Sequence, residues 1–164
     1  MADAEFLRIL EQNERFAEAF DRSALTAAPL TGLAILTCMD ARIDVEDALG
    51  LRVGDAHIIR NAGGLASQDA IRSLVVSQQL LGTREIIVIG HSKCGLHGAD
   101  EDELRERVEL STGTATQMGF GAFSDLDAMV VEQVQILLDE PSLLETSVRG
   151  MVYEVETGRL RVVV

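Results

Sequence analysis

The sequence predicts an α/β fold, in which a mostly parallel β-sheet is flanked by helices. Short apolar runs typical of buried strands alternate along the chain with segments of helical periodicity, as in βαβ units. The chain has 164 residues, 47% of them hydrophobic and 25% charged, which is sufficient for one hydrophobic core without disulfides. We therefore expect one domain over residues 1–164, with a helical arm over residues 1–28 and a strand pair at the C-terminus.

The N-terminal arm contains a predicted amphipathic helix over Ala4 to Phe20. Its apolar residues recur at helical spacings among Glu, Arg and Gln, so one side of the helix is apolar. This side could pack on the chain's own domain or on a partner, and the periodicity fits both equally well. Pro29 and Gly32 then mark a loop before the first strand.

Three predicted β-strands follow the arm. Short runs rich in β-branched and aliphatic residues define them: Leu33 to Thr37, His57 to Asn61 and Ile86 to Gly90. A helix over Asp69 to Leu81, ended by Gly82, separates the second strand from the third. A shorter helical segment over residues 44–51 separates the first from the second. Strands connected in this way are typical of a parallel sheet with right-handed crossovers.

The C-terminal part is predicted to hold one helix and two paired strands. Ser124 can cap a helix over Asp125 to Asp139, which Pro141 ends. Two apolar runs, Arg149 to Val155 and Arg159 to Val164, then flank a short polar turn. This pattern predicts a closing strand pair.

The segment from Gly95 to Ala122 is the least regular part of the sequence. It contains an acidic helix candidate, Asp100 to Leu110, followed by a Thr- and Gly-rich stretch, Ser111 to Gly121. A surface loop and a flap over the functional site are both consistent with this composition.

Charge and hydropathy exclude two kinds of partner. Lys and Arg number 14 against 27 Asp and Glu, a formal net charge of −13, so a polyanion such as DNA or RNA would be repelled. No apolar run is long enough for a transmembrane helix, and the first residues lack the basic and apolar regions of a signal peptide. We expect a cytoplasmic protein that binds neither nucleic acid nor membrane.

The two cysteines, Cys38 and Cys94, each lie close to the carboxyl end of a predicted parallel strand, the edge at which open α/β sheets bind ligands. His91 lies three residues before Cys94 and can reach the same ion, because zinc binds thiolate at about 2.3 Å and imidazole at about 2.1 Å. We therefore predict a zinc site formed by Cys38, His91 and Cys94. A disulfide and simple core packing of the thiols are the alternatives.

Three protein ligands would leave zinc one open position for water, which ionises near neutral pH at catalytic zinc sites. Asp40 and Arg42 lie two and four residues after Cys38, and alternate residues of an extended chain point to the same side. An arginine-paired carboxylate could orient the zinc-bound hydroxide. Asp40 could instead bind zinc and displace the water. An ordinary surface ion pair is the third possibility.

Three runs in this order resemble the β-class carbonic anhydrases, in particular the short bacterial and archaeal forms. They are Cys38-Met39-Asp40-Ala41-Arg42, His57-Ile58-Ile59-Arg60-Asn61-Ala62-Gly63 and Gly90-His91-Ser92-Lys93-Cys94-Gly95. The resemblance implies a zinc enzyme that interconverts carbon dioxide and water with bicarbonate and a proton. It implies Cys38, His91 and Cys94 as ligands, with Asp40 and Arg42 as the catalytic pair and Asp40 able to become a fourth ligand.

The resemblance also implies a homodimer or a higher homo-oligomer, in which the N-terminal helix embraces the partner. Two other functions stay open: hydrolysis of carbon disulfide or carbonyl sulfide on the same site, and a zinc-stabilised interaction module without activity. Some family members build an inhibitory bicarbonate pocket with a tryptophan. The sequence has no tryptophan, so this form of regulation is not expected.

A few residues near the predicted site are ambiguous. His57 lies inside a predicted strand and is interpreted as structural, whereas His97 follows the zinc motif and could relay protons. Gly63 and Gly64 either let substrate approach the backbone closely or only form a turn. Lys93 stands where many relatives have an acidic residue.

Overall fold

A computed structural model describes residues 2–164, in which a five-stranded sheet has helices on both faces. The strands are β1 (Leu33–Cys38), β2 (Ala56–Asn61), β3 (Glu85–His91), β4 (Ser147–Glu154) and β5 (Arg159–Val162). The helices are α1 (Ala2–Glu18), α2 (Val45–Leu49), α3 (Gln68–Leu81), α4 (Glu101–Thr112) and α5 (Leu126–Asp139), and a 3₁₀ turn, η1 (Ala62–Gly64), follows β2. The strand order is β2-β1-β3-β4-β5, with β5 antiparallel to β4 and the other pairs parallel. The predicted fold class is therefore confirmed.

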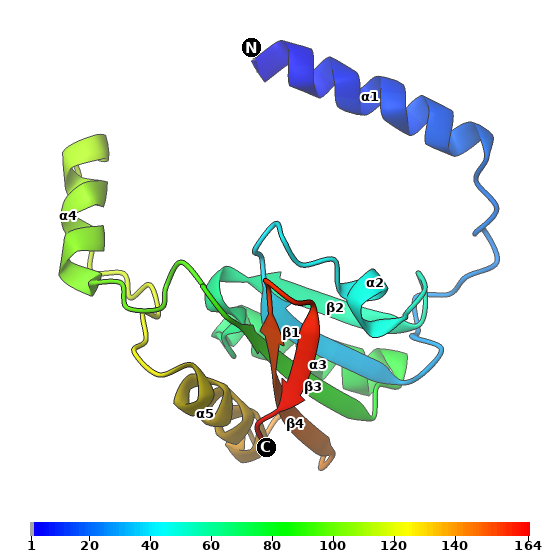
Figure 1. Cartoon of the computed structure of the whole chain (residues 1–164). Helices are drawn as coiled ribbons and strands as arrows, with labels where there is room; N and C mark the ends of the chain where they lie inside the picture. Colours follow the sequence, from blue (N-terminus) through cyan, green and yellow to red (C-terminus); the bar gives the residue numbers. More distant parts are fainter. Residues whose placement is uncertain (1) are drawn as a thin grey trace.

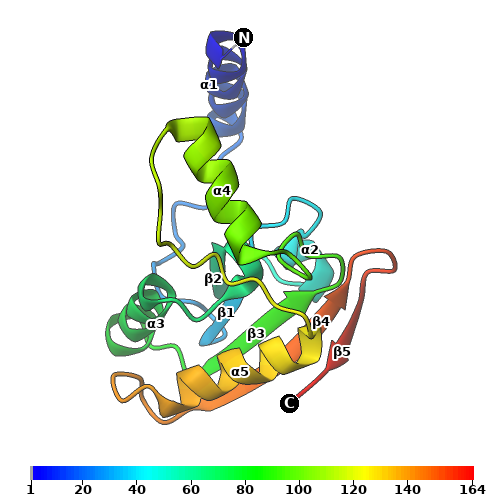
Figure 2. The ribbon, with the colours of Figure 1, turned by 90° about the vertical axis from the view of Figure 1, so that its left-hand side faces the viewer.

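The two faces of the sheet are covered by different helices. Because successive strand residues point to opposite faces, Leu36 of β1 packs with α3 and α5 whereas Ile35 packs with the α2 side. Leu74 and Leu137 fill the first face, and Val45 fills the second. Figure 2 shows α5 lying along β3 and β4. Burial on both faces fixes the adjacent β1 and β3, so their carboxyl ends lie next to each other at one edge of the sheet.

The strands that carry the predicted ligands extend one residue beyond the apolar runs. Cys38 pairs with Asn61 of β2, and His91 pairs with Tyr153 of β4. Both ligand candidates are thus the last residues of their strands, held by the parallel ladder itself. Elsewhere the ladder is shorter than predicted, because β5 ends at Val162.

Acidic and hydroxyl side chains cap the helices that pack on the sheet. The predicted cap at Ser124 is wrong by one residue, since the Asp125 carboxylate accepts the Ala128 N–H at 3.0 Å. A carboxylate is favoured over a hydroxyl here because it also interacts with the positive end of the helix dipole. The predicted segment over residues 44–51 is a shorter helix, α2, capped by Asp44.

Helices α1 and α4 project away from the sheet (Figure 1). The apolar side chains of α1 are exposed, with Phe6 61% and Leu7 62% accessible, and α4 has no buried residue. The predicted amphipathic and acidic helices are therefore both confirmed as helices, but neither contributes to the core. No helix within residues 2–164 is long and apolar enough to cross a membrane.

Candidate metal centre

Cys38, His91 and Cys94 come together at the carboxyl edge of the sheet. One potential ligand atom of each lies within 4.8 Å of those of the other two, and all three residues are buried. Cys38 and His91 end adjacent strands, and Cys94 lies in the loop that follows β3. Both thiols are free, so the predicted cluster forms without the alternative disulfide.

The two ring nitrogens of His91 have opposite surroundings. Nδ1 lies 2.9 Å from the carbonyl oxygen of Ser92, to which it donates, and this hydrogen bond assigns the proton to Nδ1. Nε2 is buried and has no hydrogen-bond partner among the described residues. Burial also lowers the pKa of His91. The ring is therefore neutral, with a free Nε2 lone pair directed into the cluster, as a metal ligand requires.

The thiols are held in surroundings that a cation would improve. Burial raises the pKa of Cys94, and the neighbouring Cys38 thiol raises it further. Two adjacent buried thiolates would repel each other, whereas a divalent cation between them would offset that cost. Two sulfurs and one imidazole nitrogen are donors that suit zinc, and the unpartnered Nε2 of His91 completes the fit. The residues present can thus hold zinc.

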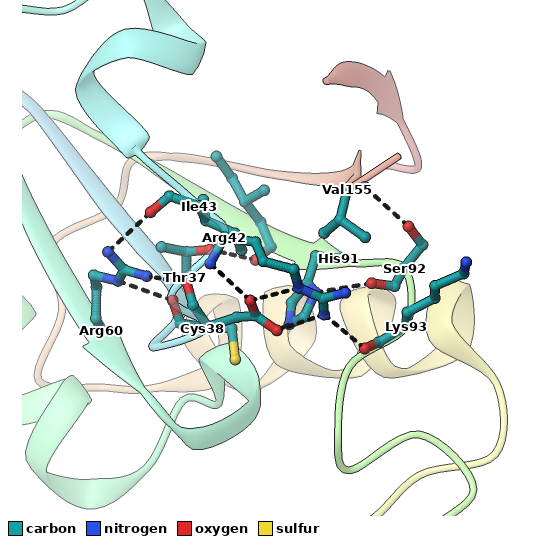
Figure 3. Close-up of polar contacts among 11 residues, drawn as sticks. Thr37, Cys38, Arg42, Ile43, Arg60, His91, Ser92, Lys93 and Val155 are labelled. Carbon is teal, nitrogen blue, oxygen red and sulfur yellow. Dashed lines mark hydrogen bonds and ion pairs between the residues drawn. The ribbon is translucent and has the colours of Figure 1, made fainter. Parts of the chain in front are cut away.

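Asp40 and Arg42 form a two-point ion pair next to the cluster; Figure 3 labels the Arg42 side chain and draws its hydrogen bonds as dashed lines. Arg42 Nε donates to Asp40 Oδ1 at 2.9 Å and Nη2 donates to Oδ2 at 2.7 Å, while the backbone N–H of Arg42 donates to Oδ1 at 3.0 Å. These hydrogen bonds hold the pKa of the Asp40 carboxyl far below its usual range. The carboxylate is therefore ionised and fixed in orientation.

The carboxylate also faces the cluster. Asp40 Oδ2 lies 3.8 Å from Nε2 of His91, but Asp40 is not part of the cluster of mutually close ligand atoms. Its hydrogen bonds go to Arg42 instead. Direct ligation by Asp40 stays a prediction.

The loop after β3 is tied to two other parts of the molecule. Nη2 of Arg42 donates to the carbonyl of Lys93 at 2.9 Å, which joins the two ligand-bearing loops. Ser92 donates its N–H to Tyr153 at 3.0 Å and accepts the Val155 N–H on Oγ at 3.1 Å. Lys93 has a φ of 54°, a left-handed conformation that costs energy for a residue with a side chain. Sequence reasoning assigned Ser92 no role, because contacts between a side chain and a distant backbone have no local signature.

A pocket of about 410 Å³ opens over the cluster. It is lined by Cys38, Met39, Asp40, Ala41, Ala62, Gly63, Cys94, Gly95 and Leu96. Apart from the two cysteines and Asp40, the lining residues are apolar or are glycines. Gly63 belongs to this wall, whereas Gly64 packs against the backbone at the end of β1. Of the segment Gly95 to Ala122, only its first two residues, Gly95 and Leu96, line the pocket, and a flap formed by the rest of it stays a prediction.

The other two histidines lie outside the cluster. The ring of His57 is held between Ser77 Oγ and the carbonyl of Ala27, at 2.6 and 2.8 Å, which agrees with the structural role predicted for it. The ring of His97 stacks on Phe123 with centroids 5.3 Å apart. Its Nε2 lies 3.1 Å from the carbonyl of Ser124. A proton relay through His97 stays a prediction.

Comparison with known proteins agrees with this geometry. The sequence model of a family described as carbonic anhydrase matches residues 33–160. The chain is also 38% identical over 152 residues to β-carbonic anhydrase 1 of Mycobacterium tuberculosis, covering 92% of this chain and 93% of that protein. The chain belongs to the β-carbonic anhydrase family. The predicted family is thus confirmed, and with it the prediction that the chain is an enzyme.

Structural similarity extends over nearly the whole chain. The crystal structure of the carbonic anhydrase from Streptococcus mutans superposes with a TM-score of 0.92 and 38% identity, covering 97% of each chain. A second group of relatives differs in activity: the carbon disulfide hydrolase of Saccharolobus solfataricus is 38% identical in an alignment that covers 77% of this chain and 74% of that protein. Membership of the β-carbonic anhydrase family alone therefore leaves the substrate to be decided.

Proposed function

We propose that this chain catalyses the zinc-dependent, reversible hydration of carbon dioxide to bicarbonate and a proton. The observation that carries the proposal is the buried Cys38–His91–Cys94 cluster with the Asp40–Arg42 ion pair directed at it. A closed structural zinc site has four protein ligands, whereas this cluster offers three. An oriented carboxylate next to the remaining position has a use only if a molecule reacts there.

Zinc would be held by the Sγ atoms of Cys38 and Cys94 and by Nε2 of His91. When bound, it supplies a Lewis acid that generates a nucleophile from water near neutral pH. The chain's own part is to orient the ligands. The hydrogen bond from His91 Nδ1 to Ser92 keeps the ring in the tautomer that binds metal through Nε2.

Asp40 would act as a fixed acceptor. Arg42 donates two hydrogen bonds to Oδ1 but only one to Oδ2, so Oδ2 keeps a second lone pair, and Oδ2 is on the side of His91 Nε2. A hydrogen bond accepted there would aim the nucleophile toward the pocket. Arg42 is a positioning residue in this scheme, because it keeps Asp40 ionised and holds both of its oxygens.

The pocket wall suits a small apolar gas. Carbon dioxide carries no charge and needs little more than aliphatic surface near the nucleophile, and Ala62, Gly63 and Leu96 provide such surface. The hold of Arg42 on Asp40 favours a site open to substrate over one closed by Asp40 as fourth ligand. We expect closure at low pH, where a carboxylate competes better with hydroxide for the metal.

Stopped-flow measurement of carbon dioxide hydration in mildly alkaline buffer tests the proposal. The zinc-loaded protein should show activity that is lost on chelation and restored by zinc. Cys38→Ser and His91→Ala should abolish it. Asp40→Asn should lower kcat by about 10–100-fold, the usual cost of losing a group that orients a metal site, while zinc stays bound. A zinc-loaded protein without hydration activity would contradict the proposal.

Carbon disulfide is the second candidate substrate, because four carbon disulfide hydrolases are similar to this chain over 77% of its length. The M. tuberculosis carbonic anhydrase is similar over 92%, and this fuller match favours carbon dioxide. Release of hydrogen sulfide from carbon disulfide, measured on the same zinc-loaded sample, separates the two activities. Hydrogen sulfide without hydration of carbon dioxide would support the second substrate.

We further infer a homodimer, or a higher homo-oligomer, built on the apolar side of α1. Phe6, Leu10 and Phe16 are 61%, 46% and 51% accessible, which is unusual for large apolar side chains clustered on one helix. A second copy would cover them. Buried thiol ligands also require a reducing environment, which supports the cytoplasm as the compartment.

A further inference from the structure

Arg60 of β2 contacts the loop that follows β1 through its whole guanidinium group (Figure 3). Nε donates to the carbonyl of Cys38 at 2.9 Å, Nη2 to the carbonyl of Asp40 at 2.7 Å and Nη1 to the carbonyl of Ile43 at 3.1 Å. Each nitrogen of the side chain therefore has a main-chain acceptor. The three acceptors extend from Cys38, the last residue of β1 and a zinc-ligand candidate, to Ile43, two residues before the start of α2.

Few other hydrogen bonds tie this loop to the sheet. Met39 donates its N–H to the carbonyl of Asn61 at 2.9 Å, directly beside the strand end. Arg42 Nη2 donates to the carbonyl of Lys93 in the loop after β3, at 2.9 Å. Other bonds are internal: Ile43 N–H donates to the Asp40 carbonyl at 3.1 Å, and Arg42 N–H donates to Asp40 Oδ1 at 3.0 Å. The internal bonds shape the turn, whereas Arg60 sets where the turn lies relative to β2.

Arginine is suited to this task. Its guanidinium is planar and permanently charged, with five N–H groups in a fixed arrangement, so three carbonyls bound to it are held at set positions. Hydrogen bonds from a charged donor are also about twice as strong as neutral ones. Lysine has the same charge but donates from a single nitrogen, and it cannot reach three carbonyls arranged around a plane.

We propose that Arg60 is a positioning residue of the metal centre, which holds Cys38 and the Asp40–Arg42 pair at the correct distance from His91 and Cys94. The expected effect on catalysis rests on the proposed function, whereas the expected effect on metal binding does not. Because one side chain fixes both the first ligand and the carboxylate, its loss should disturb metal binding and catalysis together. A residue that merely stabilises the fold would instead change global stability.

Arg60→Lys is the decisive variant. Arg60 is exposed, so this substitution keeps the charge and opens no cavity in the core. Arg72→Lys is the matched control, since Arg72 makes an exposed pair with Asp69 on α3, far from the loop in sequence. Three readouts apply to each protein: zinc affinity by competition with a chromophoric chelator, thermal unfolding, and amide hydrogen exchange of the metal-free protein.

We expect Arg60→Lys to unfold at the wild-type temperature but to bind zinc about 10–100-fold more weakly, as when other groups that orient metal ligands are lost. In the metal-free protein, exchange should accelerate at the Arg42 and Ile43 amides and stay unchanged at Ile86 in β3. Carbon dioxide hydration at saturating zinc should fall. Arg72→Lys should match wild type in every readout.

The proposal would be overturned if Arg60→Lys bound zinc with the wild-type affinity and its Arg42 and Ile43 amides exchanged at the wild-type rate. A lowered unfolding temperature with uniformly faster exchange would also overturn it, because it would show a general structural role. If the wild-type protein binds zinc without hydrating carbon dioxide, the proposed function fails, and the affinity and exchange measurements still decide the role of Arg60.

Discussion

Gly64 lies against the backbone from which Cys38 extends. Its φ is +68°, and a Cβ atom at this position would lie 2.9 Å from the carbonyl carbon of Thr37 and 3.0 Å from the amide nitrogen of Cys38. Backbone atoms of a central strand cannot move aside cheaply. The glycine is therefore required by a close approach as well as by its conformation, and it helps to set the strand end that carries a zinc-ligand candidate.

Gly64→Ala should lower the free energy of unfolding by about 1–3 kcal/mol more than Gly82→Ala, the range typical of overpacking. Gly82 is a matched control because its φ is also positive, at +77°, while no atom lies within 4 Å of a Cβ built there. Urea unfolding of the metal-free proteins measures both values. Equal losses would show that the contact with β1 adds nothing to the conformational cost.

The ligand residues could be predicted from the sequence because each follows from a local pattern and a topological rule. The predicted strands Leu33 to Thr37 and Ile86 to Gly90 indicate where the strands end, and parallel neighbours bring such ends together. The spacing of Asp40 and Arg42 from Cys38 then predicts their common side. Ser92 and Arg60 could not be found in this way. Each acts through the backbone of a neighbouring strand, and such contacts depend on the register of the assembled sheet.

At the scale of elements, Glu101 connects the start of α4 to the segment that leads into α5. Its carboxylate accepts the N–H groups of Phe120, at 3.0 and 3.1 Å to its two oxygens, and of Ala122 at 2.9 Å. Phe123 follows directly and donates its N–H to Leu96 at 3.2 Å, a residue of the pocket wall. The acidic helix is thus anchored next to the candidate site although its body is exposed.

Glu101→Gln should loosen this segment, because an amide accepts hydrogen bonds through one oxygen only and carries no charge. We expect faster amide exchange at Phe120 and Ala122. Glu103→Gln is the control, since Glu103 lies in the same helical turn and its side chain makes no hydrogen bond in the described structure. An equal response in both variants would contradict the anchoring role.

The same contact predicts a pH dependence. The N–H groups of Ala122 and Phe120 lower the pKa of Glu101, so the folded protein binds this proton less readily than the unfolded chain, in which glutamate titrates near pH about 4.3. The stabilisation is complete above that pH and is lost as pH falls through the lower folded pKa. Protection factors at Phe120 and Ala122 should decrease in that acidic range in wild type and stay flat in Glu101→Gln.

The helices show which features of an element can be predicted from local sequence and which cannot. The helices packed on the sheet were predicted within a few residues, because their apolar spacing and their glycine or proline ends are local signals. The cap of α5 was misplaced because Ser124 and Asp125 are adjacent and both are good caps. Whether α4 covers the pocket depends on packing between distant segments. Its composition of mostly charged residues does not indicate in which direction the helix projects from the sheet.

At the scale of the whole molecule, the apolar side of α1 is the feature that a single chain does not explain. The ring centroids of Phe16 and Phe20 lie 5.7 Å apart, so these two exposed rings lie next to each other at the end of α1, and Phe6, Leu7 and Leu10 are exposed nearer its start. The periodicity of the sequence predicted this surface. It could not say whether the surface packs on its own domain, and the structure leaves it exposed.

Replacing Phe6 and Leu10 by Glu should dissociate the proposed oligomer, because burial of two charges opposes association. Replacing Arg8 and Arg15 by Gln makes the same change in net charge on the polar side of α1 and should leave the assembly intact. Light scattering after gel filtration should give at least twice the 17.8 kDa chain mass for wild type and the control. A monomeric wild-type protein would contradict the assembly.

The most direct test of the account is X-ray absorption at the zinc K edge on the purified protein. The account predicts about one zinc ion per chain, with two sulfur neighbours at about 2.3 Å and at least one imidazole nitrogen near 2.0–2.1 Å. Cys94→Ser should remove one sulfur from this shell. Purified protein that takes up no zinc, or zinc surrounded by nitrogen and oxygen without sulfur, would contradict the assignment of Cys38, His91 and Cys94.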